Sequence, residues 1–232
     1  LGTGSTAAWL VRCLGEQVRD DGLRIKGVPT STRTADLARD VGIEVISLDE
    51  AKWLDLTIDG ADEFDSHLNL IKGGGGALLQ EKIVATASDQ MIVIADAAKE
   101  VEHLGAFPLP IELIPFGWLT TQALVEETLI SMDVLGRSSA LRMNGERPFV
   151  ADEGNYILDL HLQHIGNARQ LALALNQMPG VVENGLFIDI CDIVVIGDGQ
   201  GGVEVRDINK GTVEQDRLDF VETDNLFRDL TV

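Results

Sequence analysis

The pattern of apolar and polar positions in the first hundred residues predicts strands that alternate with helices. Strands are predicted, as short apolar or alternating runs, at 24–28, 43–46, 54–58 and 91–95. A helix begins at Ser31 or Thr32 and ends at Gly42, and another runs from Ala77 to Ala87. Because this alternation is typical of a parallel sheet covered on both faces, we expect a Rossmann-like, doubly wound, mostly parallel α/β sheet.

The pattern changes at residue 105. The segment from there to 187 predicts, in order, a strand at 111–114, a helix at 118–130, strands at 140–143 and 156–162, a helix at 168–176 and a strand at 181–187. That βαββαβ order folds as a small antiparallel sheet with helices on one face, the ferredoxin-like arrangement. Strands at 193–196 and 203–205 then return to the first sheet. We therefore predict a Rossmann-like catalytic domain of residues 1–104 and 188–232, with a smaller α+β domain of residues 105–187 inserted into it.

The opening residues, Gly2 to Thr6, place glycines and hydroxyls immediately before a helical period of apolar residues. They have the pattern of a strand end that turns directly into a helix, so we expect a strand upstream of residue 1. Free N–H groups and the macrodipole at a helix N-terminus favour an anion. This supports a phosphate site at Ser5 and Thr6, with an ordinary Ser or Thr helix cap as the alternative.

A run rich in carboxylates follows the strand at 54–58. Asp59-Gly60-Ala61-Asp62-Glu63 stands directly after its alternating apolar residues, and functional side chains are common at such strand ends. Considered alone, the two aspartates also fit a turn held by Asx-type hydrogen bonds. The interpretation of this run therefore depends on what lies near it.

Lys72 and four glycines, Gly73 to Gly76, precede the helix that contains Glu81. Consecutive glycines let backbone N–H groups approach a ligand without a Cβ in the way. Glu81 has apolar residues one turn to either side, so poor solvation should raise its pKa and suit a general base. Taken singly, Lys72 fits a solvated charge, the glycines a flexible connection and Glu81 an exposed helix position. Lys99, directly after the strand at 91–95, can reach the same edge of the sheet, and the whole cluster predicts one site.

Three motifs resemble ribose-5-phosphate isomerase of type A in their order and spacing: DGADE at 59–63, IKGGGGAL at 71–78 with Glu81-Lys82, and GTGST at 2–6. The resemblance extends from residue 1 to about residue 205. It covers the acidic segment 207–232 poorly, and the sequence indicates no function for that segment. It implies interconversion of ribose 5-phosphate and ribulose 5-phosphate through an enediolate, in the pentose phosphate pathway, with no cofactor or metal. It also implies a homodimer, and in this family a helix and a strand precede the GTGST motif.

The resemblance also implies roles for the residues. Glu81 would carry a proton between C2 and C1, and Lys72 would stabilise the enediolate. Asp59 or Asp62 would move hydroxyl protons, and the sequence leaves open which aspartate has which role. The residues expected to contact the substrate are Thr3, Gly4, Ser5, Thr6, Gly60, Ala61, Gly73, Gly74, Gly75 and Lys99. Among them, Ser5, Thr6 and Lys99 are expected to hold the 5-phosphate.

Composition narrows the class of partner. The 38 acidic and 18 basic side chains give a formal net charge of -20, which argues against binding to nucleic acid or to an anionic membrane surface. An anionic substrate must then be captured by local lysines and backbone donors. No apolar run reaches membrane-spanning length and no signal peptide is visible, so we expect a soluble, cytoplasmic protein. Cys13 and Cys191 are expected in the core, and the four scattered histidines are expected to be neither catalysts nor metal ligands.

Two other classes of protein remain as alternatives. A sugar-phosphate-sensing domain of a regulator would share the α/β core, but it should carry a basic winged-helix segment, and these 232 residues contain none. A coenzyme A transferase would use a glutamate as its nucleophile and would not require Lys72 with an aspartate pair beside it.

Overall fold

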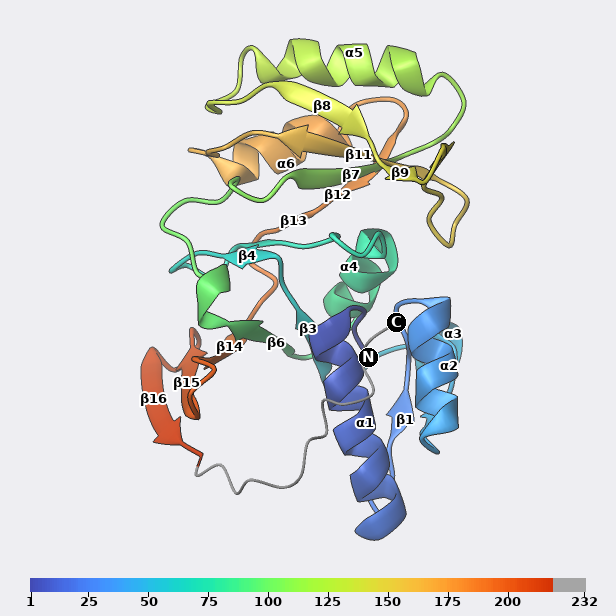
Figure 1. Ribbon diagram of the computed structural model, residues 1–232, viewed down its shortest axis with the longest axis vertical. Coiled ribbons are helices and arrows are strands. Elements are labelled where there is room, and N and C mark those ends of the chain that lie inside the picture. Colours follow the sequence, from blue (N-terminus) through green and yellow to red (C-terminus); the bar gives the residue numbers. More distant parts are fainter. Residues whose placement is uncertain (219–232) are drawn as a thin grey trace.

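The computed structural model describes residues 1–218, and its largest sheet has five strands in the order β16-β15-β14-β6-β3 (Figure 1). These strands span, in the same order, Thr212–Arg217, Gly202–Asp207, Ile193–Gly197, Met91–Asp96 and Thr57–Gly60. β3, β6 and β14 run parallel, whereas β15 and β16 form an antiparallel hairpin at one edge. Met91, Val93 and Ala95 are buried and alternate with more exposed positions, so one face of β6 lies in the core. The predicted, mostly parallel α/β sheet is confirmed.

The backbone of Leu1 and Gly2 connects this sheet to a two-stranded parallel pair. Gly2 N donates to Ile58 O at 3.0 Å, and Leu1 O accepts from Thr30 N at 3.1 Å. The pair and the three helices around it are β1 (Lys26–Gly27), β2 (Glu44–Val45), α1 (Ser5–Asp20), α2 (Thr32–Asp40) and α3 (Leu48–Ala51). Ser31 caps α2 as predicted, because its side chain accepts from the N–H of Thr34. Both paired strands are shorter than the pattern predicts.

A three-stranded antiparallel sheet lies next to the central sheet. Its strands, in the order β13-β5-β4, are Leu186–Phe187, Leu70–Ile71 and Glu63–Phe64. Phe64, Leu70 and Phe187 are fully buried and pack against Met91 and Val194 of the central sheet. This core fixes β5 and β4, and therefore the residues that directly follow and precede them, against the edge of the central sheet.

Residues 105–184, here called the insert, form a layer above the central sheet in Figure 1, whereas Leu186–Phe187 at the end of the predicted domain 105–187 belong to the three-stranded sheet. The four-stranded antiparallel sheet of the insert has the order β12-β7-β11-β8, with strands Val181–Asn184, Leu109–Leu113, Tyr156–His161 and Ser138–Leu141. Helices α5 (Trp118–Leu129) and α6 (Ala168–Asn176) cover one face, where Ile111, Leu158, Leu129 and Leu175 share a core. This is the predicted ferredoxin-like arrangement. A short hairpin of β9 (Met143–Asn144) and β10 (Arg147–Pro148) extends from β8.

Two sequence-based expectations need correction. The predicted strand at 181–187 is two strands in different sheets, because Gly185 donates to Pro110 O and accepts from Lys72 N, and a Cβ there would stand 2.3 Å from Lys72 O. Cys13 is exposed, since the buried stripe of α1 consists of Ala7, Val11 and Gly15. In the acidic segment 207–232, Asp207 ends β15, a turn and β16 follow, and residues 219–232 lie outside the described residues.

Cys191 is buried, as predicted. Helix α4 (Leu78–Thr86) buries Leu78, Glu81, Val84 and Ala85, while Ile83 remains 47% exposed. Within residues 1–218, none of the helices has both the length and the apolar character needed to cross a membrane.

Candidate active site

A cavity of about 140 Å³ lies where the end of β3, the start of α1, the glycine run and Lys99 meet. Its lining residues are Thr3, Gly4, Ser5, Thr6, Gly60, Ala61, Asp62, Lys72, Gly73, Gly74, Gly75, Glu81 and Lys99. Each of them is among the site residues predicted from the sequence, so the structure brings these distant segments to one place. The remaining predicted residue, Asp59, does not line the cavity and is buried within β3, directly behind Lys72.

Lys72 is the centre of a buried group of charges. Its Nζ lies 2.9 Å from Asp59 Oδ2 and 3.2 Å from Glu81 Oε2, and it donates to Gly60 O at 2.6 Å. The three side chains are between 1% and 4% exposed, so the interpretation of Lys72 as a solvated surface charge is wrong. Because the two carboxylates hold the ammonium from different sides, it is fixed in one position at the floor of the cavity.

The electrostatics of this group favour a proton acceptor at Glu81. Burial, followed by repulsion from Asp59, raises the pKa of Glu81 to about 8, against the opposing attraction of Lys72. Burial alone would lower the pKa of Lys72, but its attraction to Asp59 and Glu81 outweighs burial and raises that pKa above its ordinary value. Near neutral pH the group therefore pairs a permanent ammonium with a carboxyl that can both take and return a proton.

Asp62 and the glycine run form the next part of the wall. Asp62 Oδ2 accepts from Gly74 N at 2.7 Å, and its half-buried carboxyl lines the cavity. A Cβ on Gly74 would stand 2.6 Å from Asp62 Oδ1, so this close approach requires glycine. Gly73 and Gly76 have φ values of 107° and 79°, and Gly76 N donates to Gly73 O at 2.9 Å, so the run forms a turn.

The N-terminus of α1 forms the rim. Its N-cap is Gly4, and no side chain caps the helix, so the alternative of an ordinary Ser or Thr cap is wrong. The exposed N–H groups of the first turn and the side chains of Ser5 and Thr6 therefore face the cavity mouth, as expected of an anion site. Lys99 ends a short 3-10 helix, η1 (Ala97–Lys99), and forms no ion pair with any residue in 1–218.

The side chain of Thr3 makes different contacts from those of Ser5 and Thr6. Its hydroxyl contacts Thr30 Oγ1 at 2.8 Å and Ser31 Oγ at 2.9 Å, so it points into the protein. Its backbone N–H donates to Asp59 Oδ1 at 3.1 Å. Thr3 thus supports both the loop and Asp59.

The sequence does not indicate the residues that the insert contributes near this cavity. An adjoining hollow of about 190 Å³ shares Thr3, Gly4 and Gly75 with it and is closed by Phe149 and Asp152 of the insert. Asp152 Oδ2 accepts from the backbone N–H and the hydroxyl of Thr32, at 2.9 and 3.1 Å. Isolated aromatic and acidic residues far along the chain carry no local signal for such a position.

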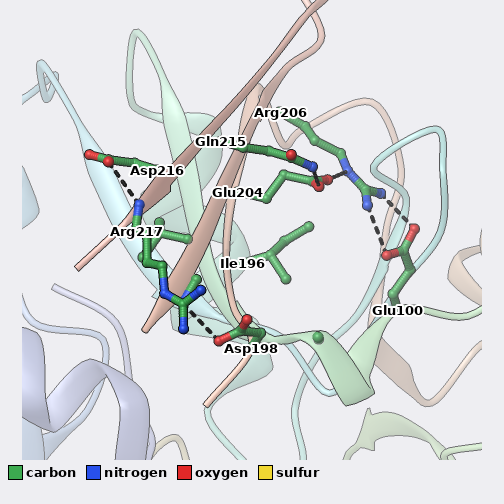
Figure 2. Close-up of a pocket in the computed structure, with 11 residues that line it drawn as sticks. Glu100, Ile196, Asp198, Glu204, Arg206, Gln215, Asp216 and Arg217 are labelled. Carbon is green, nitrogen blue, oxygen red and sulfur yellow. Dashed lines mark hydrogen bonds and ion pairs between the residues drawn. The ribbon is translucent and has the colours of Figure 1, made fainter. Parts of the chain in front are cut away.

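A larger cavity, of about 570 Å³, lies between η1 and the β15–β16 hairpin (Figure 2). Figure 2 shows Arg206 held between Glu100 and Glu204, so each of its three guanidinium nitrogens already donates to a carboxylate. Four carboxylates line this cavity against two guanidinium groups, which makes it unsuitable for a phosphorylated substrate. The smaller cavity is therefore the candidate active site.

The family model and the relatives that match this chain in sequence carry the same description. A family model described as ribose 5-phosphate isomerase A (phosphoriboisomerase A) matches residues 26–201. A ribose-5-phosphate isomerase A of Ruegeria sp. (strain TM1040) is 84% identical over 230 residues, which cover 99% of this chain and 88% of that protein. The one from Roseobacter denitrificans (strain ATCC 33942 / OCh 114) is 74% identical over 231 residues, with 100% and 88% covered.

Solved structures with the same description also resemble this chain in fold. The ribose 5-phosphate isomerase A of Methanocaldococcus jannaschii superposes with a TM-score of 0.78 at 36% identity, covering 94% of this chain and 89% of that one. A D-ribose-5-phosphate isomerase in complex with phospho-erythronic acid gives 0.79 at 38% identity, with the same coverage. By sequence, fold and the arrangement of the motifs around one cavity, this chain belongs to the ribose 5-phosphate isomerase A family.

Proposed function

We propose that this chain interconverts D-ribose 5-phosphate and D-ribulose 5-phosphate through an enediolate, as a step of the pentose phosphate pathway. The observation that carries the proposal is Glu81 Oε2, which lies 3.2 Å from Lys72 Nζ at the floor of a cavity whose rim is an uncapped helix N-terminus. Moving a carbonyl between adjacent carbons of a phosphorylated sugar needs a base, a positive group and an anion site. The regulator alternative lacks this support, because the relatives are isomerases by name.

Glu81 is the proposed base. It takes the proton from C2 of the open-chain aldose, and the electron pair left on C2 shifts toward the C1 carbonyl to give the enediolate. The same carboxyl then returns the proton to C1, while the proton on O2 passes to O1, so that O2 becomes the new carbonyl oxygen and O1 a hydroxyl. A pKa of about 8 suits both transfers near neutral pH, because the proton is neither too strongly nor too weakly held.

Lys72 and the glycine run stabilise the negative charge that develops on O1 and O2 in our proposal. The ammonium is fixed by Asp59 and Glu81 before the substrate arrives, so little reorganisation is needed during the reaction. Backbone N–H groups of the run lie on the cavity wall beside it. The proposed stabilisation is therefore a preorganised set of donors in a nearly dry site.

The positions of the two aspartates suggest different roles. Asp62 lines the cavity, so we propose that it moves hydroxyl protons, including those transferred when the furanose ring opens. Asp59 is buried behind Lys72, and its oxygens are engaged by Lys72 Nζ and by the N–H groups of Thr3 and Gly60. We therefore propose that Asp59 acts through Lys72, whose charge and position it fixes.

The 5-phosphate is proposed to bind at the α1 N-terminus. Ser5 and Thr6 supply hydroxyls and helix N–H groups there, and Lys99 supplies a charge. A solved relative that binds phospho-erythronic acid, a phosphorylated four-carbon acid, supports a substrate of this size and charge. Local cations matter because the formal net charge of -20 repels anions on average.

We also propose that the enzyme acts as a homodimer in the cytoplasm, and that its domains are residues 1–104 with 188–232, and residues 105–187. Membership of a family of metabolic enzymes supports the location, and the separate four-stranded sheet of the insert supports the division. Light scattering after size-exclusion chromatography would decide the oligomeric state.

The decisive experiment follows ketose formation from ribose 5-phosphate in the presence of a chelator. Glu81→Gln should still bind ribose 5-phosphate in a calorimetric titration but lose on the order of 10²- to 10⁴-fold in kcat. Glu127→Gln, an exposed helical glutamate of α5, is the matched control and should keep wild-type turnover. If Glu81→Gln retains half of the activity, Glu81 is not the base. If wild-type protein binds the sugar phosphate and forms no ketose, the isomerase proposal itself is wrong.

A further inference from the structure

Arg142 of the insert contacts the glycine run directly. Its Nη1 donates to Gly73 O at 2.9 Å and to Gly74 O at 3.0 Å. It is the residue that follows β8, 68 to 69 positions along the chain from these glycines. Nothing in the proposed chemistry assigns Arg142 a role, although it bonds two carbonyls of residues that line the active site.

A second residue of the insert fixes the guanidinium itself. Asp159 on β11 accepts from Arg142 Nε at 2.9 Å and from Nη2 at 2.5 Å, a two-pronged ion pair with side chains 16% and 19% exposed. The backbone of Arg142 is held as well, because its N–H donates to Ile157 O and its carbonyl accepts from Phe149 N. The guanidinium has thus one orientation, with a single edge left to meet the glycine carbonyls.

The geometry of a trans peptide transmits this contact to the cavity. In a trans peptide the N–H points opposite to the C=O of the same plane. The carbonyl of Gly73 is held by Arg142, and the N–H of that same plane, which belongs to Gly74, donates to Asp62 Oδ2 at 2.7 Å. The carbonyl of Gly74 is held likewise, so the N–H of Gly75, a residue that lines the cavity, is directed away from Arg142.

Glycine makes this support necessary. Glycines have many accessible backbone conformations, so a run of four does not hold its peptide planes by itself. One hydrogen bond within the run, from Gly76 N to Gly73 O at 2.9 Å, closes a turn, and contacts from outside the run help to select the observed φ values of 107° at Gly73 and 79° at Gly76. Arg142 contacts the carbonyls of the two planes whose N–H groups belong to Gly74 and Gly75.

We propose that Arg142, oriented by Asp159, is a positioning residue that fixes the peptide planes of Gly73 and Gly74, so that the loop presents Asp62 and the Gly75 N–H to the reacting oxygens. The inference rests on the proposed isomerase function, and it gives the insert a part in catalysis. Its effect falls on the transition state, where aligned donors matter most, more than on capture of the phosphate at the α1 N-terminus.

The test compares Arg142→Ala, Arg142→Lys and Asp159→Asn with the wild-type enzyme in steady-state isomerisation. Arg142→Ala should lower kcat by about 10- to 100-fold, the scale of a misplaced catalytic group, while KM changes by less than about threefold. Inhibition by inorganic phosphate, which probes the α1 site alone, should be unchanged. Arg142→Lys keeps a donor and should recover part of kcat. The kcat of Asp159→Asn should lie between those of Arg142→Ala and Arg142→Lys. Hydrogen exchange should become faster in the segment 73–76.

Arg137→Ala is the matched control, because Arg137 is an arginine of the insert whose Nε donates to a backbone carbonyl, that of Leu129, away from the cavity. It should keep wild-type kcat. Where Arg142→Ala proves unfolded by circular dichroism, Arg142→Lys and Asp159→Asn decide the question. A kcat within twofold of wild type in the folded variants, a loss confined to KM, or an equal loss in Arg137→Ala would each overturn the role of Arg142. These outcomes leave the isomerase proposal intact, since that depends on wild-type turnover and on Glu81→Gln.

Discussion

Lys72 Nζ and Glu81 Oε2 lie 3.2 Å apart, and both side chains are almost completely shielded from solvent. A buried ion pair of this kind is poor evidence for stability, because desolvation of the two charges offsets much of their attraction. Here a third charge, Asp59, adds repulsion on Glu81 and attraction on Lys72. The arrangement is therefore better explained by its effect on protonation than by a gain in folding free energy.

The first prediction concerns the pH dependence of turnover. Because the pKa of Glu81 is raised to about 8, the fraction of unprotonated base should grow as pH rises toward that value. Below the midpoint kcat/KM should increase by about tenfold per pH unit, and it should level off above it. The pKa of Lys72 is raised above 10.5, so no alkaline loss from this group is expected below that pH. A rise in kcat/KM centred near pH 4.5, the ordinary pKa of a glutamate, would contradict this assignment of the base.

The second prediction concerns stability. A carboxyl whose pKa is higher in the folded than in the unfolded protein binds more protons when folded between those two values. The contribution of Glu81 to stability should therefore be complete below about pH 4.5 and should be lost as pH rises through about 8. Urea titrations at several pH values would show this loss, and Glu81→Gln should remove it. Equal slopes in the two proteins would contradict the raised pKa.

The third prediction removes the positive member of the group. Lys72→Met leaves Asp59 and Glu81 buried without their cation, which should cost about 3–5 kcal/mol in the free energy of unfolding at pH 9, above the pKa of Glu81. At pH 5 the cost should shrink, because Glu81 can be neutral there. Turnover should be lost at both pH values. Lys26→Met, which breaks an exposed ion pair with Glu44, is the control and should change stability by less than about 1 kcal/mol.

The sequence around Lys72 and Glu81 is enough to predict that both belong to a site. Glu81 lies in a helix with apolar neighbours on several sides, and Lys72 precedes glycines, so the amino-acid sequence alone is enough to place both at a site. The end of β3 is less predictable: the strand continues through Asp59 and Gly60, which the sequence pattern assigns to the loop after it. A buried charge inside a strand contradicts its apolar pattern, and it is acceptable here because Lys72 and the N–H groups of Thr3 and Gly60 satisfy it.

Contacts between distant segments carry no such signal. Arg142 and Asp159 lie in ordinary strand surroundings, and their role depends on how the insert docks on the glycine run. The split of the predicted strand 181–187 depends in the same way on the close approach of Gly185 to Lys72 O. In both cases the deciding partner is more than 65 residues away, beyond the reach of periodicity or propensity.

The fourth prediction concerns the close contact between Gly74 and Asp62. In Gly74→Ala the new Cβ would stand 2.6 Å from Asp62 Oδ1, so the carboxylate or the loop must move. A shift of this size should lower kcat by about 10- to 100-fold while the protein remains folded. Gly197→Ala is the control, because its Cβ would meet nothing within 4 Å and it lies outside the cavity. Wild-type kcat in Gly74→Ala would show that the Asp62–Gly74 contact is not needed.

The fifth prediction concerns Lys99 and the ion pair next to it. Glu100 follows Lys99 directly, and its carboxylate accepts from Arg206 Nη1 at 2.6 Å and from Nη2 at 2.9 Å (Figure 2). Its backbone N–H donates to Ala97 O, which closes the turn that carries Lys99. Arg206 on β15 thus anchors the end of η1 through Glu100, and the loss of that anchor should let Lys99 move away from the proposed phosphate site.

Arg206→Ala should therefore raise KM for ribose 5-phosphate by about two- to fivefold, the scale of a partly exposed ion pair, with kcat nearly unchanged. Lys99→Ala removes the ammonium itself and should raise KM further. Lys210→Ala, which breaks an ion pair with Asp207 on the same hairpin, is the matched control and should keep the wild-type KM. An unchanged KM in Arg206→Ala, alongside a raised one in Lys99→Ala, would mean that η1 holds its position without the Glu100–Arg206 pair. The position of Lys99, and with it the binding of the phosphate, would then depend on the Asp96 cap. The Asp96 side chain accepts from Ala98 N at the start of η1.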